Sequence, residues 1–228
     1  MKYTKVIKGI FLERPNRFIA RVIINGNEET VHVKNTGRCR EILRPGTEVI
    51  LEEADNENRK TKYSLVGAYK GDVLINIDSQ IPNMVISESI KNNEIEEFQN
   101  ITFLKREVTF KNSRFDIYCE GTNRKIFIEI KGVTLEKDKT AMFPDAPTQR
   151  GLKHVMELME AVKIGYEGFV IFLIQMKGVN YFTPNYEMDS KFSEGLKKAA
   201  KNGVKILAFD SIVEEDGIIL GESIKVKF

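Results

Sequence analysis

Three residues in the middle of the chain have types and a spacing that suit a hard divalent cation. In the segment SRFDIYCEGTNRKIFIEIKGV, Asp116 precedes a turn, and Glu129 and Lys131 follow it two residues apart. If KIFIEIK is a strand, its side chains alternate between two faces, so Glu129 and Lys131 share one face with Phe127. The turn formers in GTNR allow the two segments to pair as a hairpin, and neighbouring strands lie about 4.8 Å apart. Asp116 and Glu129 are therefore expected to be close enough to share one cation.

This ligand set predicts a particular chemistry. Two carboxylates and the Ile130 carbonyl would hold Mg²⁺ or Mn²⁺ and leave coordination positions for water. Such a cation polarises a phosphate oxygen and lowers the pKa of a bound water, which is the chemistry of phosphodiester hydrolysis. Lys131 would orient that water or neutralise charge on the phosphate, and nearby positive charges should keep both carboxylates ionised. The alternative is an exposed ion-pair ladder worth under about 1 kcal/mol, and spacing alone leaves both interpretations open.

The residues after Asp78 predict a mixed sheet flanked by helices, which would position these groups. A helix is expected from Pro82 over NMVISESIKNNEIEEF, followed by strands over ITFLKREVTF, SRFDIYCE and KIFIEIKGV. A second helix begins near Thr148, with an apolar stripe that includes Met156 and Met159. GFVIFLIQM has the continuous apolar character of a strand covered on both faces, and a helix over 190–202 and a strand over VKILAF complete the order. We assign residues 81–228 to this domain.

Residues 1–80 predict a separate, small β-barrel of the OB type. Its β-type runs are VIKGIFLERP, RFIARVIING, EETVHVKN, TEVILEEA and KYSLVGAYKGDVLINI. The turn formers between them are Asn25-Gly26, Asn35-Thr36-Gly37, Pro45-Gly46 and Asp55-Asn56. Short strands with almost no helical periodicity favour a barrel, and a sandwich is the alternative architecture.

Basic side chains concentrate in this first domain and form a candidate nucleic-acid-binding surface. An OB-type barrel can follow a phosphate backbone with such charges and stack bases on nearby aromatic rings such as that of Phe18. Several glutamates dilute the cluster, so an ordinary charged barrel surface is the alternative. The candidate residues are Arg14, Arg17, Arg21, Lys34, Arg38 and Arg40.

The composition excludes several classes of protein. The net charge of +2 neither requires nor excludes nucleic acid. No apolar run approaches the roughly 20 residues that cross a bilayer, and the charged N-terminal segment does not fit a signal peptide, so we expect a cytoplasmic protein with no membrane partner. Cys39 and Cys119 lack metal-type spacing, which predicts two buried free thiols in a reducing compartment. Dinucleotide fingerprints and Gly-rich phosphate loops are missing, which argues against nucleotide-cofactor chemistry.

Several long motifs connect the chain to a known family. These are VHVKNTGR, SRFDIYCE, FIEIKGVTL, FPDAPTQRGLKHVMEL and GVKILAF, of which FPDAPTQRGLKH is the most specific. On these motifs the chain resembles the sugar fermentation stimulation protein family, SfsA, over essentially its whole length. The resemblance implies an OB-like domain joined to a restriction-endonuclease-like domain similar to PD-(D/E)xK nucleases, with the D…ExK elements on Asp116, Glu129 and Lys131. Val-Lys precedes Asn35 where the family more often has a proline, which affects no catalytic residue.

The resemblance also implies residues that would support the centre. Related nucleases often place an additional carboxylate on the first helix, and Glu88 in ISESI is the candidate. Without the resemblance, the polar side of the helix after Pro147 would be read as a solvated face with Lys153 paired to Glu157. The residue in the FPDAP loop would either turn toward the centre or shape the loop. The candidate supporting residues are Gln149, Arg150, His154 and Asp145.

Two functions are compatible with these observations. The first is a DNA-binding protein with a divalent-metal-dependent nuclease site that hydrolyses phosphodiesters, with DNA preferred to RNA as the polymer. The second, implied by the family's association with sugar utilisation, is a non-catalytic DNA-binding regulator that keeps the nuclease fold. A protein for a small metabolite has little support in the motifs. We find no helix-turn-helix pattern, so sequence-specific reading of a promoter is not expected.

Overall fold

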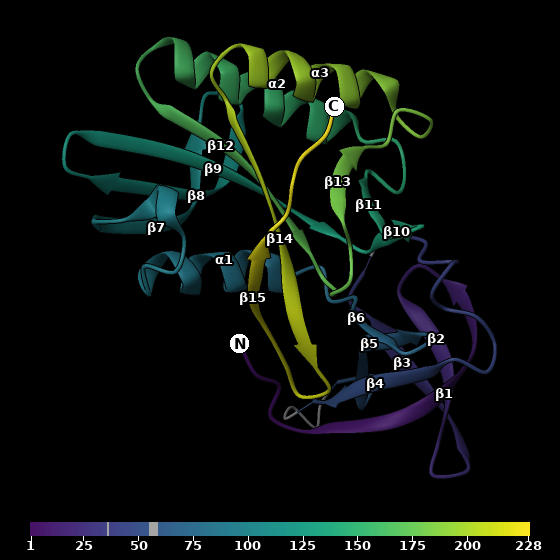
Figure 1. Cartoon of the computed structure of the whole chain (residues 1–228). Coiled ribbons are helices and arrows are strands. Elements are labelled where there is room, and N and C mark those ends of the chain that lie inside the picture. Colours follow the sequence, from purple (N-terminus) through teal and green to yellow (C-terminus); the bar gives the residue numbers. More distant parts are fainter. Residues whose placement is uncertain (36, 55–58) are drawn as a thin grey trace.

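The computed structural model describes residues 1–35, 37–54 and 59–228, and these form two domains packed against each other (Figure 1). The expected turn at Asp55-Asn56 and the central residue of the expected Asn35-Thr36-Gly37 turn lie outside the described residues. No helix in the described ranges is long and apolar enough to span a membrane.

The first domain is a closed barrel. Its described strands are β1 (Val6–Asn16), β2 (Ile19–Ile24), β3 (Asn27–Val33), β4 (Glu48–Glu53), β5 (Tyr63–Lys70) and β6 (Val73–Asn76). They are ordered β3-β2-β1-β4-β5-β6, and β3 also pairs in parallel with β5, placing His32 opposite Ser64. This extra pairing gives each strand from β1 to β5 at least two neighbours, so the sheet closes on itself. The barrel prediction is confirmed, and the sandwich alternative is wrong.

Alternation and a tight turn explain the first hairpin of the barrel. Along β2, Ala20, Val22 and Ile24 face the core, whereas Arg21 faces solvent. Asn25 and Gly26 both have positive φ, at 50° and 81°, as a two-residue hairpin turn requires. The turn therefore fixes the register in which β2 meets β3.

The second domain is built on a mixed sheet ordered β15-β14-β12-β9-β8-β7. Its strands are β7 (Ile101–Phe110), β8 (Ser113–Gly121), β9 (Arg124–Val133), β12 (Glu167–Ile174), β14 (Lys205–Glu214) and β15 (Gly217–Ser223). β12 runs parallel to both β9 and β14, and the remaining pairs are antiparallel. Helices α2 (Gln149–Lys163) and α3 (Ser190–Lys201) lie together on one face, and α1 (Ile81–Lys91) lies on the other (Figure 1). The predicted mixed sheet flanked by helices is confirmed.

Several elements differ from the prediction. A small second sheet joins β10 (Leu135–Lys137), β11 (Thr140–Phe143) and β13 (Tyr181–Pro184), and none of these strands nor β15 was expected. The first helix ends at Lys91 because Asn93 adopts a φ of 55°, and only the short 3-10 turn Glu96–Phe98 follows. On α2, Met159 is buried as expected, but Met156 is 36% exposed.

The two faces of β9 belong to different apolar clusters, as alternation predicted. Ile126, Ile128 and Ile130 pack on the α1 side of the sheet. Phe127 packs on the α2 side, in a cluster that includes Val155. The side chains of β9 therefore keep a regular period of two through the segment that carries Glu129.

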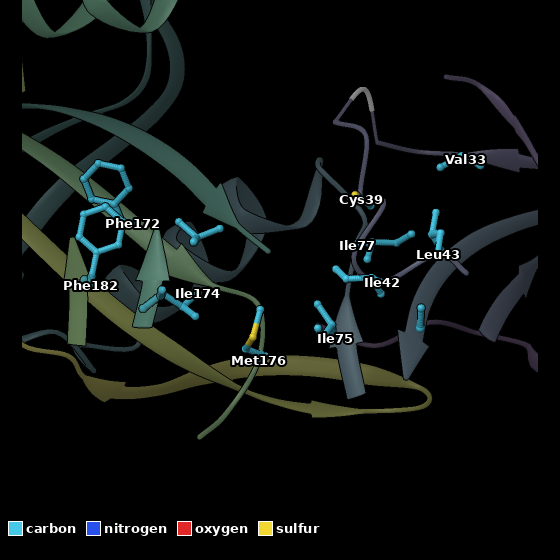
Figure 2. Packing of buried hydrophobic residues seen from close by; sticks show 14 of the residues in the cluster. Val33, Cys39, Ile42, Leu43, Ile75, Ile77, Phe172, Ile174, Met176 and Phe182 are labelled. Atoms are coloured by element: carbon cyan, nitrogen blue, oxygen red, sulfur yellow. The ribbon is translucent and has the colours of Figure 1, made fainter. Parts of the chain in front are cut away.

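The domains share a continuous apolar core. The cluster on the α2 side continues into the barrel, and Figure 2 shows Met176 between Ile174 of the second domain and Ile75 of the first. Gln175 adds polar contacts, because its Nε2 donates to Asn76 Oδ1 at 2.9 Å. The expected division into residues 1–80 and 81–228 stays a prediction. α1 begins at Ile81, but Lys2 forms a bridge with Gly217 of the second domain.

Both cysteines are buried free thiols, as predicted. Burial raises the pKa of Cys39 and of Cys119 to about 12, so neither thiol ionises readily at neutral pH. Their chemistry is that of small apolar core residues.

Candidate metal centre and nucleic-acid surface

Asp116 lies at a distortion shared by β7 and β8. Phe115 packs into the cluster on the α2 side, whereas Ile117, two residues further on, packs on the α1 side. In a regular strand these two side chains would share a face. Glu107 lies opposite Asp116 in the register and has a φ of 58°, which is strained for a glutamate. The strand changes face here, and the Asp116 side chain turns toward the neighbouring strand β9.

The Asp116 carboxylate takes the place of a backbone acceptor between β8 and β9. Their regular pairing ends at Ile117 and Ile128, and beyond it the Ile130 N–H donates to Asp116 Oδ2 at 2.7 Å. From α1, Asn83 Nδ2 donates to Oδ1 at 2.8 Å. The N–H and C=O of a strand residue point to the same side, so the Ile130 carbonyl also lies toward Asp116. This orientation suits the ligand role predicted for that carbonyl.

Glu129 is the most enclosed acid of the centre, with a side chain that is 2% exposed. Its Oε1 accepts from the Lys131 ammonium and lies 2.6 Å from His154 Nδ1 on α2. Its Oε2 is buried and has no hydrogen-bond partner among the described residues. An unsatisfied buried acceptor costs about 1–3 kcal/mol, and more when it is charged. A cation would satisfy this oxygen, so the residues present fit a divalent metal.

The electrostatic environment separates the two carboxyl groups. Burial acts to raise the pKa of Glu129, but Lys131 and His154 outweigh it and hold the pKa below its ordinary value. For Asp116, burial and the negative charge of Glu129 raise the pKa despite the opposing effect of Lys131. The expectation that positive charges hold both pKa values down is therefore met at Glu129 and not at Asp116. Asp116 Oδ2 accepts from the N–H of Ile130, the residue next to Glu129, so the two acidic residues are neighbours across β8 and β9.

The burial of this group does not fit the exposed ion-pair ladder. Glu129 is almost fully enclosed, and the Lys131 side chain is only 18% exposed. Among the described residues, however, no third His, Cys, Asp or Glu side chain joins the two acids in a group that would hold a metal. The protein ligands available for a cation are therefore the two carboxylates and the Ile130 carbonyl.

The structure does not bring Glu88 to the centre. Its side chain is 56% exposed and pairs with the Met1 amino group at 3.1 Å. The α1 residue that reaches Asp116 is Asn83, one position after Pro82, which was not among the predicted site residues. A polar residue in the first turn of the helix was the only signal that could have identified it.

The four supporting candidates have different positions. His154 is buried and contacts Glu129, as a supporting residue would, although its position away from the apolar stripe had by itself favoured a solvated face. Gln149 and Arg150 are exposed in the first turn of α2 and make no side-chain hydrogen bond within the described ranges. Asp145 lies at the domain border, where a Cβ on Gly37 would come within 2.5 Å of its Oδ2.

A basic pocket of about 490 Å³ opens on the barrel. Arg17, Arg38 and Arg40 line it, are exposed, and form no ion pair with any described residue. Phe18 lies beside it and is 51% exposed, and its ring centroid is 5.7 Å from the Arg17 guanidinium. The pocket therefore combines unpaired cations with an accessible aromatic face, the combination that nucleic-acid surfaces use.

The other three basic candidates serve the fold. The Arg14 guanidinium lines the same pocket but donates to four backbone carbonyls, at distances of 2.5–2.9 Å. Arg21 pairs with glutamates on the neighbouring strands. Lys34 bonds Glu52 at 2.7 Å and Asp78 at 3.2 Å. Arg21 and Lys34 do not line the basic pocket. Of the six predicted binding residues, only Arg17, Arg38 and Arg40 therefore remain available there to a ligand, within the described part of the chain.

Comparisons with known proteins agree with this architecture. The chain matches the SfsA N-terminal OB domain over residues 12–77 and the sugar fermentation stimulation protein RE domain over residues 80–217. Sugar fermentation stimulation protein homologs of Alkaliphilus oremlandii (strain OhILAs) and Desulfitobacterium hafniense (strain DSM 10664 / DCB-2) are 59% and 57% identical. The alignments cover all of this chain and 99% and 98% of those proteins.

A solved structure shares the whole fold. The structure of Pyrococcus furiosus SfsA in complex with Ca²⁺ matches with a TM-score of 0.92 at 30% identity, covering 100% of this chain and 98% of that one. Both domains and their arrangement therefore closely resemble those of that protein. With its OB and RE domains matched in order, the chain belongs to the sugar fermentation stimulation protein family, SfsA.

Proposed function

We propose that this protein binds DNA along its OB domain and hydrolyses phosphodiester bonds at a divalent-metal centre formed by Asp116, Glu129 and the Ile130 carbonyl. The observation that carries the proposal is the buried, unpartnered Oε2 of Glu129 beside a second carboxylate. A relative of the same fold is described in complex with Ca²⁺, a hard cation that prefers oxygen ligands. Mg²⁺ or Mn²⁺ is the expected cofactor.

When bound, the metal would supply a polarised phosphate oxygen and a water of lowered pKa. The side chains around it have positioning tasks. Asn83 and the Ile130 N–H fix both oxygens of Asp116, and His154 and Lys131 fix Oε1 of Glu129 so that Oε2 stays available. The Lys131 ammonium, partly exposed at the edge of this group, would stabilise negative charge on a phosphate.

The basic pocket provides the binding surface for the polymer. Arg17, Arg38 and Arg40 would contact phosphates, and the exposed ring of Phe18 would stack on a base. DNA in preference to RNA, and a cytoplasmic location, are parts of the same proposal. The two buried, unpaired thiols suit a reducing compartment.

Cleavage assays test the catalytic proposal directly. The full chain, with Mn²⁺, should cut plasmid or single-stranded DNA, and Glu129→Gln and Lys131→Ala should each reduce the rate by at least about 100-fold. Glu88→Gln is the matched control, because this glutamate lies outside the centre, and it should keep the wild-type rate. Unchanged cleavage by the Glu129 and Lys131 variants would contradict the assignment.

A non-catalytic DNA-binding regulator remains the second candidate. It is favoured by one observation, the lack of a third acidic or histidine ligand among the described residues. It predicts DNA binding that weakens steeply with salt and is unchanged by EDTA, together with no cleavage in Mn²⁺. Measuring binding and cleavage on the same DNA distinguishes the two functions.

A further inference from the structure

A small polar pocket lies between the two domains, beside the acidic centre. It has a volume of about 140 Å³. Gly132 lines it and directly follows Lys131 on β9. A Cβ on Gly132 would come within 2.8 Å of Pro82, the neighbour of Asn83 on α1. The polar lining consists of Asn35, Ser79, Thr134, Asp145 and Gln175.

Gln175 presents a fixed acceptor to this pocket. Its side chain is almost fully buried, at 1% exposure. The Nε2 group donates to Asn76 Oδ1 at 2.9 Å and to the Asp78 carbonyl at 3.1 Å, which fixes the orientation of the amide. Oε1 therefore faces Gly132, where any larger residue would overlap it, and it accepts no hydrogen bond from the residues that the structure describes. This acceptor is available to a ligand that donates an N–H or O–H.

Asp145 provides the second acceptor. Its carboxylate lies against Gly37 of the barrel and forms neither an ion pair nor a hydrogen bond within the described ranges. No basic side chain is found among the described residues that line the pocket. The Arg14 guanidinium lies close by, but it is bound to the Asn35 and Gly37 carbonyls and does not line the pocket. A lining with a carboxylate, an amide oxygen and no basic side chain disfavours a phosphate and favours a neutral group that carries hydrogen-bond donors.

The pocket also adjoins the basic pocket, because Gly37 lines both. A strand held by its phosphates at Arg17 and Arg38 could continue over this glycine with its bases toward the interdomain pocket. The first pocket is suited to the backbone and the second to a base edge.

We propose that the interdomain pocket receives one unpaired nucleobase of the bound strand and selects bases that carry an amino group, guanine above all. The inference rests on the proposed binding of DNA. Guanine offers adjacent N1–H and N2–H donors that match the two oxygens of Asp145. Adenine and cytosine offer one amino group each, and thymine offers none. Displacing a base into a pocket next to the reacting centre is a known way to position a strand.

Binding of the full chain to labelled oligonucleotides in EDTA tests this inference without requiring cleavage. The probes are short oligo(dT) strands with a single central dG, deoxyinosine or dT. Their binding is measured by fluorescence anisotropy. A bidentate base contact predicts that the dG strand binds about tenfold more tightly than the dT strand. Deoxyinosine, which lacks the N2 amino group, should lose most of that advantage.

Asp145→Asn should remove the preference for dG, so that this variant binds the dG and plain oligo(dT) strands with equal affinity. Asp72→Asn, in the exposed turn between β5 and β6, is the matched control and should keep the preference. Equal binding of dG and deoxyinosine strands by the wild type would overturn the inference, whatever the variants do, and so would failure to bind any strand. If the preference is found but Mn²⁺ produces no cleavage, the proposed catalysis fails and the base pocket stands.

Discussion

Replacing His154 by alanine tests how the centre holds its buried carboxylate. The imidazole Nδ1 lies 2.6 Å from Glu129 Oε1, and the two side chains are 8% and 2% exposed. His154 also meets the Phe115 ring edge-on, with centroids 6.1 Å apart. In His154→Ala both contacts are lost, and among the described residues Lys131 is then the only side chain that contacts Glu129 Oε1.

The expected magnitudes follow from these contacts. A hydrogen bond to a charged group contributes about 1.5–3 kcal/mol, and an aromatic edge contact about 0.5–1 kcal/mol. We therefore expect His154→Ala to lower the free energy of unfolding of the metal-free protein by about 2–4 kcal/mol. Because the variant frees Glu129 to rotate, it should also weaken Mn²⁺ binding about 10- to 100-fold.

Urea denaturation in EDTA and calorimetric titration with Mn²⁺ measure the two effects. Lys153→Ala is a matched control on the same helix, because this side chain is 52% exposed and its contacts, with the Asn112 carbonyl at 2.8 Å and with Glu157 at 3.9 Å, lie outside the centre. It should change stability by less than about 1 kcal/mol and leave Mn²⁺ affinity unaltered. A double-mutant cycle with Glu129→Gln should give a coupling free energy of about 2 kcal/mol. Wild-type Mn²⁺ affinity in His154→Ala would refute the positioning role.

Three further predictions concern stability, binding and metal. Lys34→Met should destabilise the protein by about 3 kcal/mol at neutral pH, because Asp78, 1% exposed, loses its ion-pair partner. Burial raises the pKa of Asp78, and the protonated carboxyl needs no cation. In urea titrations the loss of stability should therefore shrink as the pH falls through that pKa. A loss of stability that does not depend on pH would contradict this. Arg14→Ala should lower the urea midpoint, because its guanidinium binds backbone carbonyls. Arg17→Ala should keep the midpoint and reduce the salt slope of DNA binding by about one. A wild-type slope in Arg17→Ala would exclude a phosphate contact at this residue. Mn²⁺ at 100 times its Kd should stabilise the wild type by about 2.7 kcal/mol in thermal melts but not Glu129→Gln, and equal stabilisation of both would place the metal elsewhere.

Regular periodicity made much of the fold predictable. The alternation of β9 is unbroken, so the face shared by Phe127 and Glu129 could be deduced from the residues alone. The turn at Asn25-Gly26 and the short β-type runs likewise predicted the barrel. In these segments local preference and burial agree, which is the condition under which pattern-based inference works.

The geometry around Asp116 could not be deduced in the same way. It depends on a positive φ at Glu107, and glutamate carries no sequence signal for that conformation. Asn83 was missed because its partner Asp116 is distant in the chain. The pairing of Lys34 with Asp78 was hidden for the same reason, and the lysine was therefore assigned to the binding surface.

Burial on the second helix was misjudged because α2 has two neighbours. It packs against both α3 and the sheet, so its buried face is wider than a single apolar stripe, and His154 lies on the sheet side against Phe115 and Glu129. Met156, counted in the stripe, instead lies partly exposed. The strands β10, β11 and β13 are three or four residues long, too short to show a period.

The apolar core that runs from Ile75 through Met176 to Ile174 leaves little freedom for a hinge at the domain border. The barrel and the sheet should therefore melt together, in a single calorimetric transition. A rigid border also fixes the distance that a DNA strand must span between the arginines of the basic pocket and the two acidic residues. Any cut should therefore fall at a constant number of nucleotides from the segment bound by the barrel.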